Sequence, residues 1–252
     1  MVKIIMKGCN GKMGQVITGL VQEDENAVIV AGIDRVNNIE NGYPVYPSLE
    51  ECDIEADVLI DFSGIHGLEE MLDIAVKRNL PIVLCTTGFS KEQLEIIDAT
   101  SKKIPILRSA NMSIGINTIM SVLKAVTQVL VDANFDIEIV ERHHNQKLDA
   151  PSGTAIALAD TINEVLHNEY EYVYDRSQVR EKRTKNQIGI SAVRGGTIVG
   201  EHEVIFAGTD EVIEVKHTAY SKAIFAKGAI QAAKFLAGQQ PGMYDMSKVV
   251  GK

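Results

Sequence analysis

Residues 137–155 carry an unusual density of side chains that can donate protons or hydrogen bonds. His143, His144 and Lys147 follow an alternating apolar and charged run that is typical of a strand. Ser152-Gly153-Thr154 comes next and is typical of a helix start, where free main-chain N–H groups and hydroxyls bind anions. An imidazole titrates near neutrality and an ammonium attracts carboxylates, so this segment suits a carboxylate-bearing substrate that needs a proton.

Two other interpretations apply to the same histidines. Adjacent residues of a strand point in opposite directions, and neither a histidine at i+4 nor a cysteine cluster is nearby, so no metal is expected. A lone loop histidine is more often structural than catalytic. The convergence of Lys147, Ser152 and Thr154 on the same short stretch favours a functional site instead.

The N-terminal sequence indicates a dinucleotide site. Glycines at three-residue intervals follow a short apolar run and open a helical pattern in Gly8-Cys9-Asn10-Gly11-Lys12-Met13-Gly14. Such glycines allow a tight turn, and the helix N-terminus binds the pyrophosphate. Asp34 ends the next predicted strand, where an acidic residue bonds the ribose hydroxyls; its alternative role is to cap a loop. Arg35 beside it can pair with a 2′-phosphate, so both NADH and NADPH are expected to serve.

Three further strand ends are expected to line the same cleft, because ligands of such sheets bind outside the carboxyl ends of the strands. They are Asp61-Phe62-Ser63, Cys85-Thr86-Thr87-Gly88-Phe89 and Ser109-Ala110-Asn111-Met112. For Phe62, ordinary core packing is an equal alternative. His66 is more typical of a solvated loop than of a cofactor contact.

The elements that must position these residues follow from the hydrophobic pattern. Short apolar strands alternate with amphipathic helices up to residue 109, which is typical of a doubly wound parallel sheet. Beyond it we expect two long helices, a strand before the histidines, a charged helix-and-loop segment at 167–185 and a three-strand meander. A capping-box spacing at Ser48 predicts a short helix. The final helix, Ala223–Leu236, suits packing back onto the first domain.

The predicted fold is therefore α/β: a Rossmann-like doubly wound sheet plus an α+β domain with an open mixed sheet. The dinucleotide-binding domain is expected at 1–113 with 222–252, and the substrate-binding and oligomerisation domain at 114–221. An open sheet of that kind is often covered by another subunit.

Bulk properties exclude some classes of function. The 252 residues carry a net charge of −9, which argues against nucleic acid as the main partner. No stretch is expected to approach the length that crosses a bilayer, and no signal peptide is recognised. Three widely spaced cysteines show no disulfide or metal-ligand pattern, which indicates a reducing cytoplasm.

The run from Glu141 to Ala155 resembles the E-x-H-H-x-x-K-x-D-x-P-S-G-T-A signature of the 4-hydroxy-tetrahydrodipicolinate reductase (dihydrodipicolinate reductase) family. The segments GCNGKMG, CTTGF, SANMSIGIN and VGEHEV are similar to the same family, so the resemblance covers essentially the whole chain. One departure is Lys222, which stands where an arginine is expected and cannot form the same bidentate contact.

The resemblance implies NAD(P)H-dependent reduction of 4-hydroxy-tetrahydrodipicolinate with loss of water, on the diaminopimelate route to lysine, by a homotetramer. It implies that His143 is the proton donor, Lys147 a second donor or an anchor, and His144, Gly153 and Thr154 substrate contacts. The expected cofactor contacts are Gly8, Cys9, Asn10, Gly11, Lys12, Met13, Asp34, Arg35, Cys85, Thr86, Thr87, Ser109, Ala110, Asn111 and Met112.

Two other functions are weighed against this one. Another Rossmann reductase of an amino-acid-like substrate, such as an aspartate dehydrogenase-type protein, would lack the HH-x-x-K-x-D-x-P-S-G-T loop. A dinucleotide-sensing protein without catalysis would need a DNA-binding or partner segment, and the acidic sequence shows none.

Overall fold

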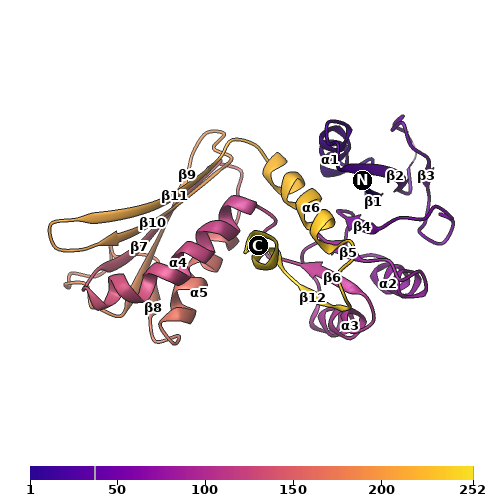
Figure 1. Cartoon of the computed structure of the whole chain (residues 1–252). Helices are drawn as coiled ribbons and strands as arrows, with labels where there is room; N and C mark the ends of the chain where they lie inside the picture. The colour runs from indigo at the N-terminus through magenta and orange to yellow at the C-terminus, as the bar shows by residue number, and fades with distance from the viewer. Residues whose placement is uncertain (37, 252) are drawn as a thin grey trace. The chain divides into compact units, whose positions relative to one another are not determined.

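The computed structural model describes residues 1–36 and 38–251, and the chain divides into two compact units (Figure 1). The first unit combines Met1–Ile114 with Ala223–Lys252, and the second is Gly115–Lys222. The chain therefore leaves the first unit, builds the second, and returns to finish the first.

The first unit contains a parallel sheet of seven strands in the order β12-β6-β5-β4-β1-β2-β3. From β3 to β6 this is the doubly wound order, which confirms the predicted Rossmann-like fold. Strand β4 is buried at every position, as expected for a parallel sheet covered on both faces. The strands are β1 (Val2–Lys7), β2 (Ala27–Ile33), β3 (Val45–Tyr46), β4 (Val58–Asp61), β5 (Ile82–Leu84), β6 (Pro105–Arg108) and β12 (Gly242–Tyr244).

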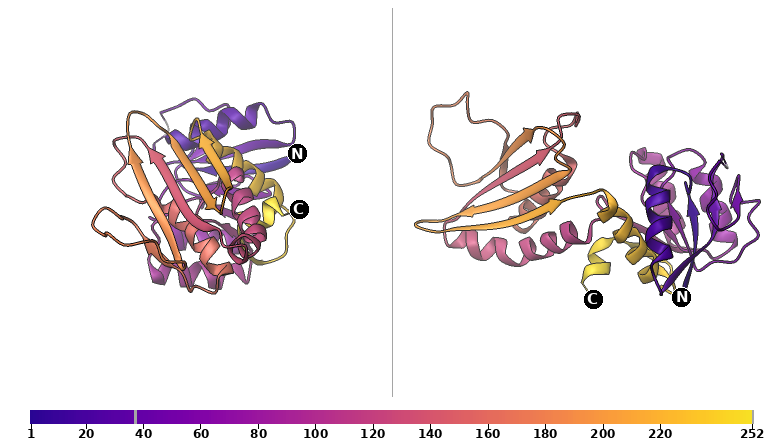
Figure 2. Two further views of the ribbon diagram at one scale, coloured as in Figure 1. Left: turned by 90° about the vertical axis from the view of Figure 1, so that its left-hand side faces the viewer. Right: turned by 90° about the horizontal axis from the view of Figure 1, so that it is seen from above.

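Helices cover both faces of this sheet (Figure 2). One apolar cluster joins the sheet to α1, α6 and α7, and a second cluster joins it to α2 and α3. Helix α3 begins at a capping box, in which the Ser90 hydroxyl accepts from the Gln93 N–H and the Gln93 side chain accepts from the Ser90 N–H. The helices are α1 (Lys12–Gln22), α2 (Leu68–Lys77), α3 (Lys91–Ser101), α6 (Ala223–Leu236) and α7 (Met246–Val250).

The second unit contains a mixed sheet of five strands in the order β11-β10-β7-β9-β8. Helices α4 and α5 lie on the same side of it (Figure 1) and contribute to a third apolar cluster. The α+β domain with an open mixed sheet is thereby confirmed. Its elements are α4 (Ile114–Asp132), β7 (Asp136–His143), α5 (Gly153–Val165), β8 (Glu171–Val173), β9 (Gln187–Arg194), β10 (Gly200–Ala207) and β11 (Val212–Ala219).

Three details of the predicted elements are wrong. Strands β9, β10 and β11 do not form a meander, because β7 lies between β9 and β10 and pairs with both. The residues after Ser48 form only a turn, in which its hydroxyl accepts from the Glu51 N–H. The segment 167–185 contains strand β8 and no helix, because its residues 171–173 pair with β9.

Helix α4 corrects the expectation that no segment approaches membrane-spanning length. Its 19 residues are long and apolar enough to cross a bilayer by length and composition alone. That criterion is also met by core helices, and α4 contributes Leu123 to the apolar cluster of the second unit. The side chains of Val122 and Val129 are exposed on it.

Candidate functional site

Strand β7 directs Glu141 and His143 toward the face of the sheet that α4 and α5 cover. Its burial alternates strictly along the strand, so that Ile137, Ile139, Glu141 and His143 are buried while the residues between them are partly exposed. This is the period of two expected for a strand with one covered face. Ile137 and Ile139 anchor the strand in the apolar cluster, and Glu141 and the predicted acid His143 lie at its end.

Glu141 is a buried carboxylate that receives hydrogen bonds from three sides. Its Oε2 lies 2.6 Å from Nδ1 of His143, and its two oxygens each lie 2.7 Å from a terminal nitrogen of Arg194. The main-chain N–H of Ser152 donates to its Oε1 at 2.9 Å. Burial by itself raises the pKa of Glu141, but the bonds from Arg194, His143 and Ser152 outweigh it and lower that pKa. The group is an anion with satisfied oxygens.

A second buried histidine, His202 on β10, lies next to His143. The two rings meet edge to face with centroids 5.1 Å apart, and Nε2 of His202 is 2.9 Å from the Ser152 hydroxyl. Burial and then the neighbouring His143 lower the pKa of His202 to about 4, so His202 is neutral at pH 7. In the part of the chain that the structure describes, no cluster of His, Cys, Asp and Glu is arranged to hold a metal ion.

The loop after β7 brings the other predicted substrate residues to the start of α5. Ser152 caps this helix by accepting from the Ala155 N–H, so Gly153 and Thr154 form its first turn. Nζ of Lys147 lies 2.9 Å from the Asp149 carboxylate, which lowers the pKa of Asp149 through that hydrogen bond. The peptide bond before Pro151 is cis.

His144 directly follows the last residue of β7. Its Nδ1 is buried and, among the described residues, has no hydrogen-bond partner. A buried polar atom without a partner is costly, and a bound ligand removes that cost. His144 therefore has the property expected of a ligand contact.

In the first unit, the glycine-rich loop between β1 and α1 depends on two glycines. Gly8 has a φ of 82°, a conformation that favours glycine, and a Cβ on Gly14 would lie 2.2 Å from the Gly8 carbonyl oxygen. Helix α1 is capped by Gly11, which has no side chain to bond the first N–H groups. The start of α1 therefore has no side-chain cap that would compete with an anion.

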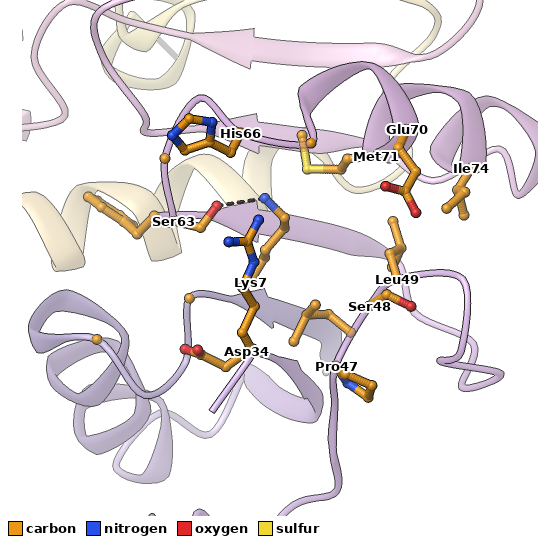
Figure 3. Close-up of a pocket in the computed structure, with 17 residues that line it drawn as sticks. Lys7, Asp34, Pro47, Ser48, Leu49, Ser63, His66, Glu70, Met71 and Ile74 are labelled. Carbon is orange, nitrogen blue, oxygen red and sulfur yellow. Dashed lines mark hydrogen bonds between the residues drawn. The ribbon is translucent and has the colours of Figure 1, made fainter. Parts of the chain in front are cut away.

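A cavity of about 380 Å³ opens at the carboxyl ends of β1, β2 and β4 (Figure 3). Four of the predicted cofactor residues line it, namely Gly8, Gly11, Asp34 and Arg35. Phe62 and His66 line it too, so Phe62 serves both the cavity and the apolar cluster, and His66 is exposed at its edge. The carboxylate of Asp34 accepts from the Asn10 N–H at 3.0 Å, which ties the glycine-rich loop to the end of β2.

Beside this cavity, the buried Asp61 connects the end of β1 to the segments that follow β4 and β5. Its Oδ1 accepts from Nζ of Lys7 at 3.1 Å and from Ser63, and its Oδ2 accepts from the Thr86 hydroxyl at 2.9 Å. Lys7 also donates to the Ser63 hydroxyl at 2.6 Å (Figure 3). Burial and the Asp61 charge raise the pKa of the Cys85 thiol, which favours its neutral form.

The remaining predicted cofactor residues differ in how much side chain they offer. Cys9 and Met112 are buried in the first apolar cluster, so only their main chain is available. The side chains of Lys12, Thr87 and Ala110 are exposed, and the partly buried ones are Asn10, Met13, Cys85, Thr86, Ser109 and Asn111. Cys85–Thr87 and Ser109–Met112 follow β5 and β6 at the same edge of the sheet, outside the lining of the cavity.

Sequence reasoning missed the roles of Lys7, Arg194 and His202. Lys7 precedes the first glycine and Arg194 ends β9, far from their partners in the sequence. A weak signal exists for His202, because it occupies an inward position of an alternating strand. A polar residue at such a position needs a buried partner.

The fold and these two polar centres define a class, the Rossmann-type oxidoreductases with an added α+β unit. The comparisons with known proteins are more specific. The family described as dihydrodipicolinate reductase, N-terminus, matches residues 2–112, and dihydrodipicolinate reductase, C-terminus, matches residues 115–250. The chain belongs to the dihydrodipicolinate reductase family.

Relatives named 4-hydroxy-tetrahydrodipicolinate reductase match over the full length. The protein from Caldanaerobacter subterraneus subsp. tengcongensis is 52% identical over 100% of this chain and 99% of its own. The protein from Clostridium novyi is 50% identical over 99% of this chain and 98% of its own. Among solved structures, a dipicolinate-bound dihydrodipicolinate reductase from Paenisporosarcina sp. TG-14 has a TM-score of 0.82 at 26% identity, covering 98% of this chain and 99% of that one.

Proposed function

We propose that this chain is an NAD(P)H-dependent reductase that converts 4-hydroxy-tetrahydrodipicolinate to tetrahydrodipicolinate with loss of water, on the diaminopimelate route to lysine. Two observations support it: the full-length relatives that bear this name, and the buried His143 beside the N-terminus of α5. The second observation carries the proposal, because a proton donor next to a helix start is what the reduction of an anionic substrate needs.

The first unit fits a nicotinamide dinucleotide. The Gly8 turn, the start of α1 without a side-chain cap and the cavity beside Asp34 and Arg35 are the parts that such a cofactor needs. Gly8 and Gly11 would admit the pyrophosphate, Asp34 the ribose hydroxyls and Arg35 a 2′-phosphate. When bound, NAD(P)H supplies the hydride of the reduction.

The second unit is proposed to bind the substrate. The start of α5 at Gly153 and Thr154 offers one carboxylate the positive end of the helix dipole. Nδ1 of His144, which has no partner among the described residues, and the ammonium of Lys147 add donors for the anionic substrate. The dipicolinate in the related structure is a dicarboxylate, which supports the same class of ligand here. His143 provides the proton that balances hydride addition.

We also propose that the chain assembles as a homotetramer in the cytoplasm. Helices α4 and α5 cover one face of the second sheet, while the opposite face carries partly exposed side chains, among them Val140, Arg142 and Ile205. A second subunit covering that face would complete the layers that a domain core needs. The three cysteines are free, as a reducing compartment requires. Light scattering after size exclusion tests the assembly, and a monomer would exclude it.

The test of the activity is the oxidation of NADH or NADPH, followed by absorbance, with 4-hydroxy-tetrahydrodipicolinate generated enzymatically in the same cuvette. Turnover dependent on that substrate is expected. No turnover with either cofactor would rule out the proposed function. L-Aspartate formation from oxaloacetate and ammonia serves as the control reaction, since activity there would point to an aspartate dehydrogenase-type enzyme.

A further inference from the structure

We propose that Glu141, held by Arg194, is a positioning residue that sets the tautomer and the charge of His143 during the reaction. This inference rests on the proposed function and goes beyond it, because neither residue has been given a role there. The geometry that carries it is the closed set of contacts around one carboxylate: His143, Arg194 and the Ser152 N–H, all within 2.9 Å.

Glu141 determines which ring nitrogen of His143 carries the hydrogen in the neutral form. An ionised carboxylate only accepts hydrogen bonds, so Nδ1 of His143 carries the hydrogen that points at Glu141. The proton that His143 gives to the substrate is then the one on Nε2. Gly200 leaves that atom clear, because a Cβ at this position would lie 3.1 Å from Nε2. Glu141 therefore selects which nitrogen reacts.

Glu141 and Arg194 also affect the charge of His143. The carboxylate of Glu141 stabilises the imidazolium form of His143, whereas the guanidinium of Arg194 opposes it by neutralising that carboxylate. Strand register brings this about, because β9 places Arg194 directly opposite His143 on β7. Glu141 and Arg194 thus act on His143 in opposite directions.

The other charged and titratable groups near His143 are His202, His217 and Lys147. His202 on β10 is neutral at pH 7, and burial lowers the pKa of His217 on β11. Lys147 in the following loop is paired with Asp149. None of these groups reaches Glu141 by a hydrogen bond in the described part of the chain, so Arg194 is the matched partner for a test.

Glu141 also connects His143 to the start of α5. Glu141 accepts from the N–H of Ser152, the residue that caps α5, while its other oxygen accepts from His143. One carboxylate therefore fixes both the ring that donates the proton and the helix start that is proposed to bind the substrate. A change at Glu141 is expected to disturb proton donation more than nucleotide binding.

The test is the pH dependence of kcat between pH 6 and 10 for Glu141→Gln, Arg194→Met and Arg194→Lys. With His143 as an acid, kcat falls as pH rises. Glu141→Gln is expected to move this fall to lower pH by about one unit and to reduce kcat at pH 7 about a hundredfold. Arg194→Met is expected to move it to higher pH by about one unit, and Arg194→Lys to leave it near that of the wild type.

The control is Glu164→Gln, which removes a carboxylate that is paired with Lys124 at the surface of α5. Its profile should coincide with that of the wild type. The proposal would be overturned if the pH at which kcat falls moved in the same direction in Glu141→Gln and Arg194→Met, or moved in neither. Loss of structure alone does not move the two pH profiles in opposite directions. Absence of turnover in the wild type would instead refute the proposed function.

Circular dichroism and nucleotide binding establish that each variant is folded. Should Glu141→Gln fail to fold, Arg194→Met and Arg194→Lys decide the question. The proposal then requires that the fall in kcat moves to higher pH in Arg194→Met. In Arg194→Lys, which keeps the charge, it should stay near the pH of the wild type.

Discussion

The two units each contain one buried carboxylate that gathers hydrogen-bond donors at strand ends, and the donors differ. Asp61 receives them from Lys7, Ser63 and Thr86, at the edge of a parallel sheet. Glu141 receives them from Arg194, the Ser152 N–H and an imidazole. None of the three groups around Asp61 is a histidine. The same arrangement thus joins strand ends in one unit and holds an imidazole ring in the other.

Replacing His143 by Gln should produce the largest effect, because it removes the group that distinguishes the Glu141 centre. We expect kcat to fall by about 10²- to 10⁴-fold, the usual contribution of a general acid, while the affinity for NADH stays unchanged. Steady-state kinetics and fluorescence titration measure the two quantities. The control is His167→Asn, at an exposed residue after α5. A His143→Gln enzyme within twofold of the wild type would exclude the acid role.

In the first unit the critical atoms belong to the main chain, so a single methyl group should matter. Gly14→Ala places a Cβ 2.2 Å from the Gly8 carbonyl oxygen and is expected to cost about 3 kcal/mol of stability and to weaken NADH binding. Gly19→Ala, in the same helix with no atom within 4 Å of the new Cβ, should instead stabilise by about 0.5 kcal/mol. Urea unfolding distinguishes them, and equal effects would contradict the proposed close approach.

The Glu141 centre should also make the stability of the protein depend on pH. The pKa of His202 is about 4 in the folded chain and about 6.5 when unfolded. Between these values the unfolded chain binds a proton that the folded chain does not, so stability falls as pH falls through this window. The loss from pH 7 to pH 4.5 is about 2 kcal/mol. Unfolding curves of His202→Gln should show a smaller loss than the wild type; identical losses would contradict the assignment.

Asp61→Asn tests the other half of the comparison and should have the smallest effect. It removes the charge that holds Lys7 and is expected to raise KM for the nucleotide about tenfold, the value of one charged hydrogen bond. The pH at which kcat falls should not change, since the described partners of Asp61 are Lys7, Ser63 and Thr86 and include no imidazole. A shift in that pH would show that the two centres are not functionally distinct.

Much of the fold could be predicted because its signals are local. The apolar strands, the glycine triplet and the helix cap at Ser152 all lie within short windows, and helix α6 has the predicted bounds. Strand order in the second unit could not be read, because the pairing of β7 with β9 and β10 joins residues far apart in the sequence. Short pieces such as β3 and β12 have too little pattern to be recognised.

The candidate site divides in the same way. His143, Lys147 and the start of α5 occupy one continuous signature, so their types and spacing indicated the chemistry. The partners that set their properties come from other strands: Arg194 lies opposite His143 only through the β7–β9 register, and His202 only through β10. A sequence pattern names the acid, whereas the fold supplies the groups that control it.

The return of the chain to its first unit has a consequence for synthesis. Helix α6 contributes Ala226, Ala229 and Ile230 to the apolar cluster on one face of the nucleotide sheet, and its Lys234 pairs with Asp24 beyond α1. A ribosome makes the whole glycine-rich loop early, yet that face stays open to water until α6 has emerged. The nucleotide unit therefore matures after the second unit, and a chain that stops before Ala223 carries every glycine of the loop without the core that holds it in place.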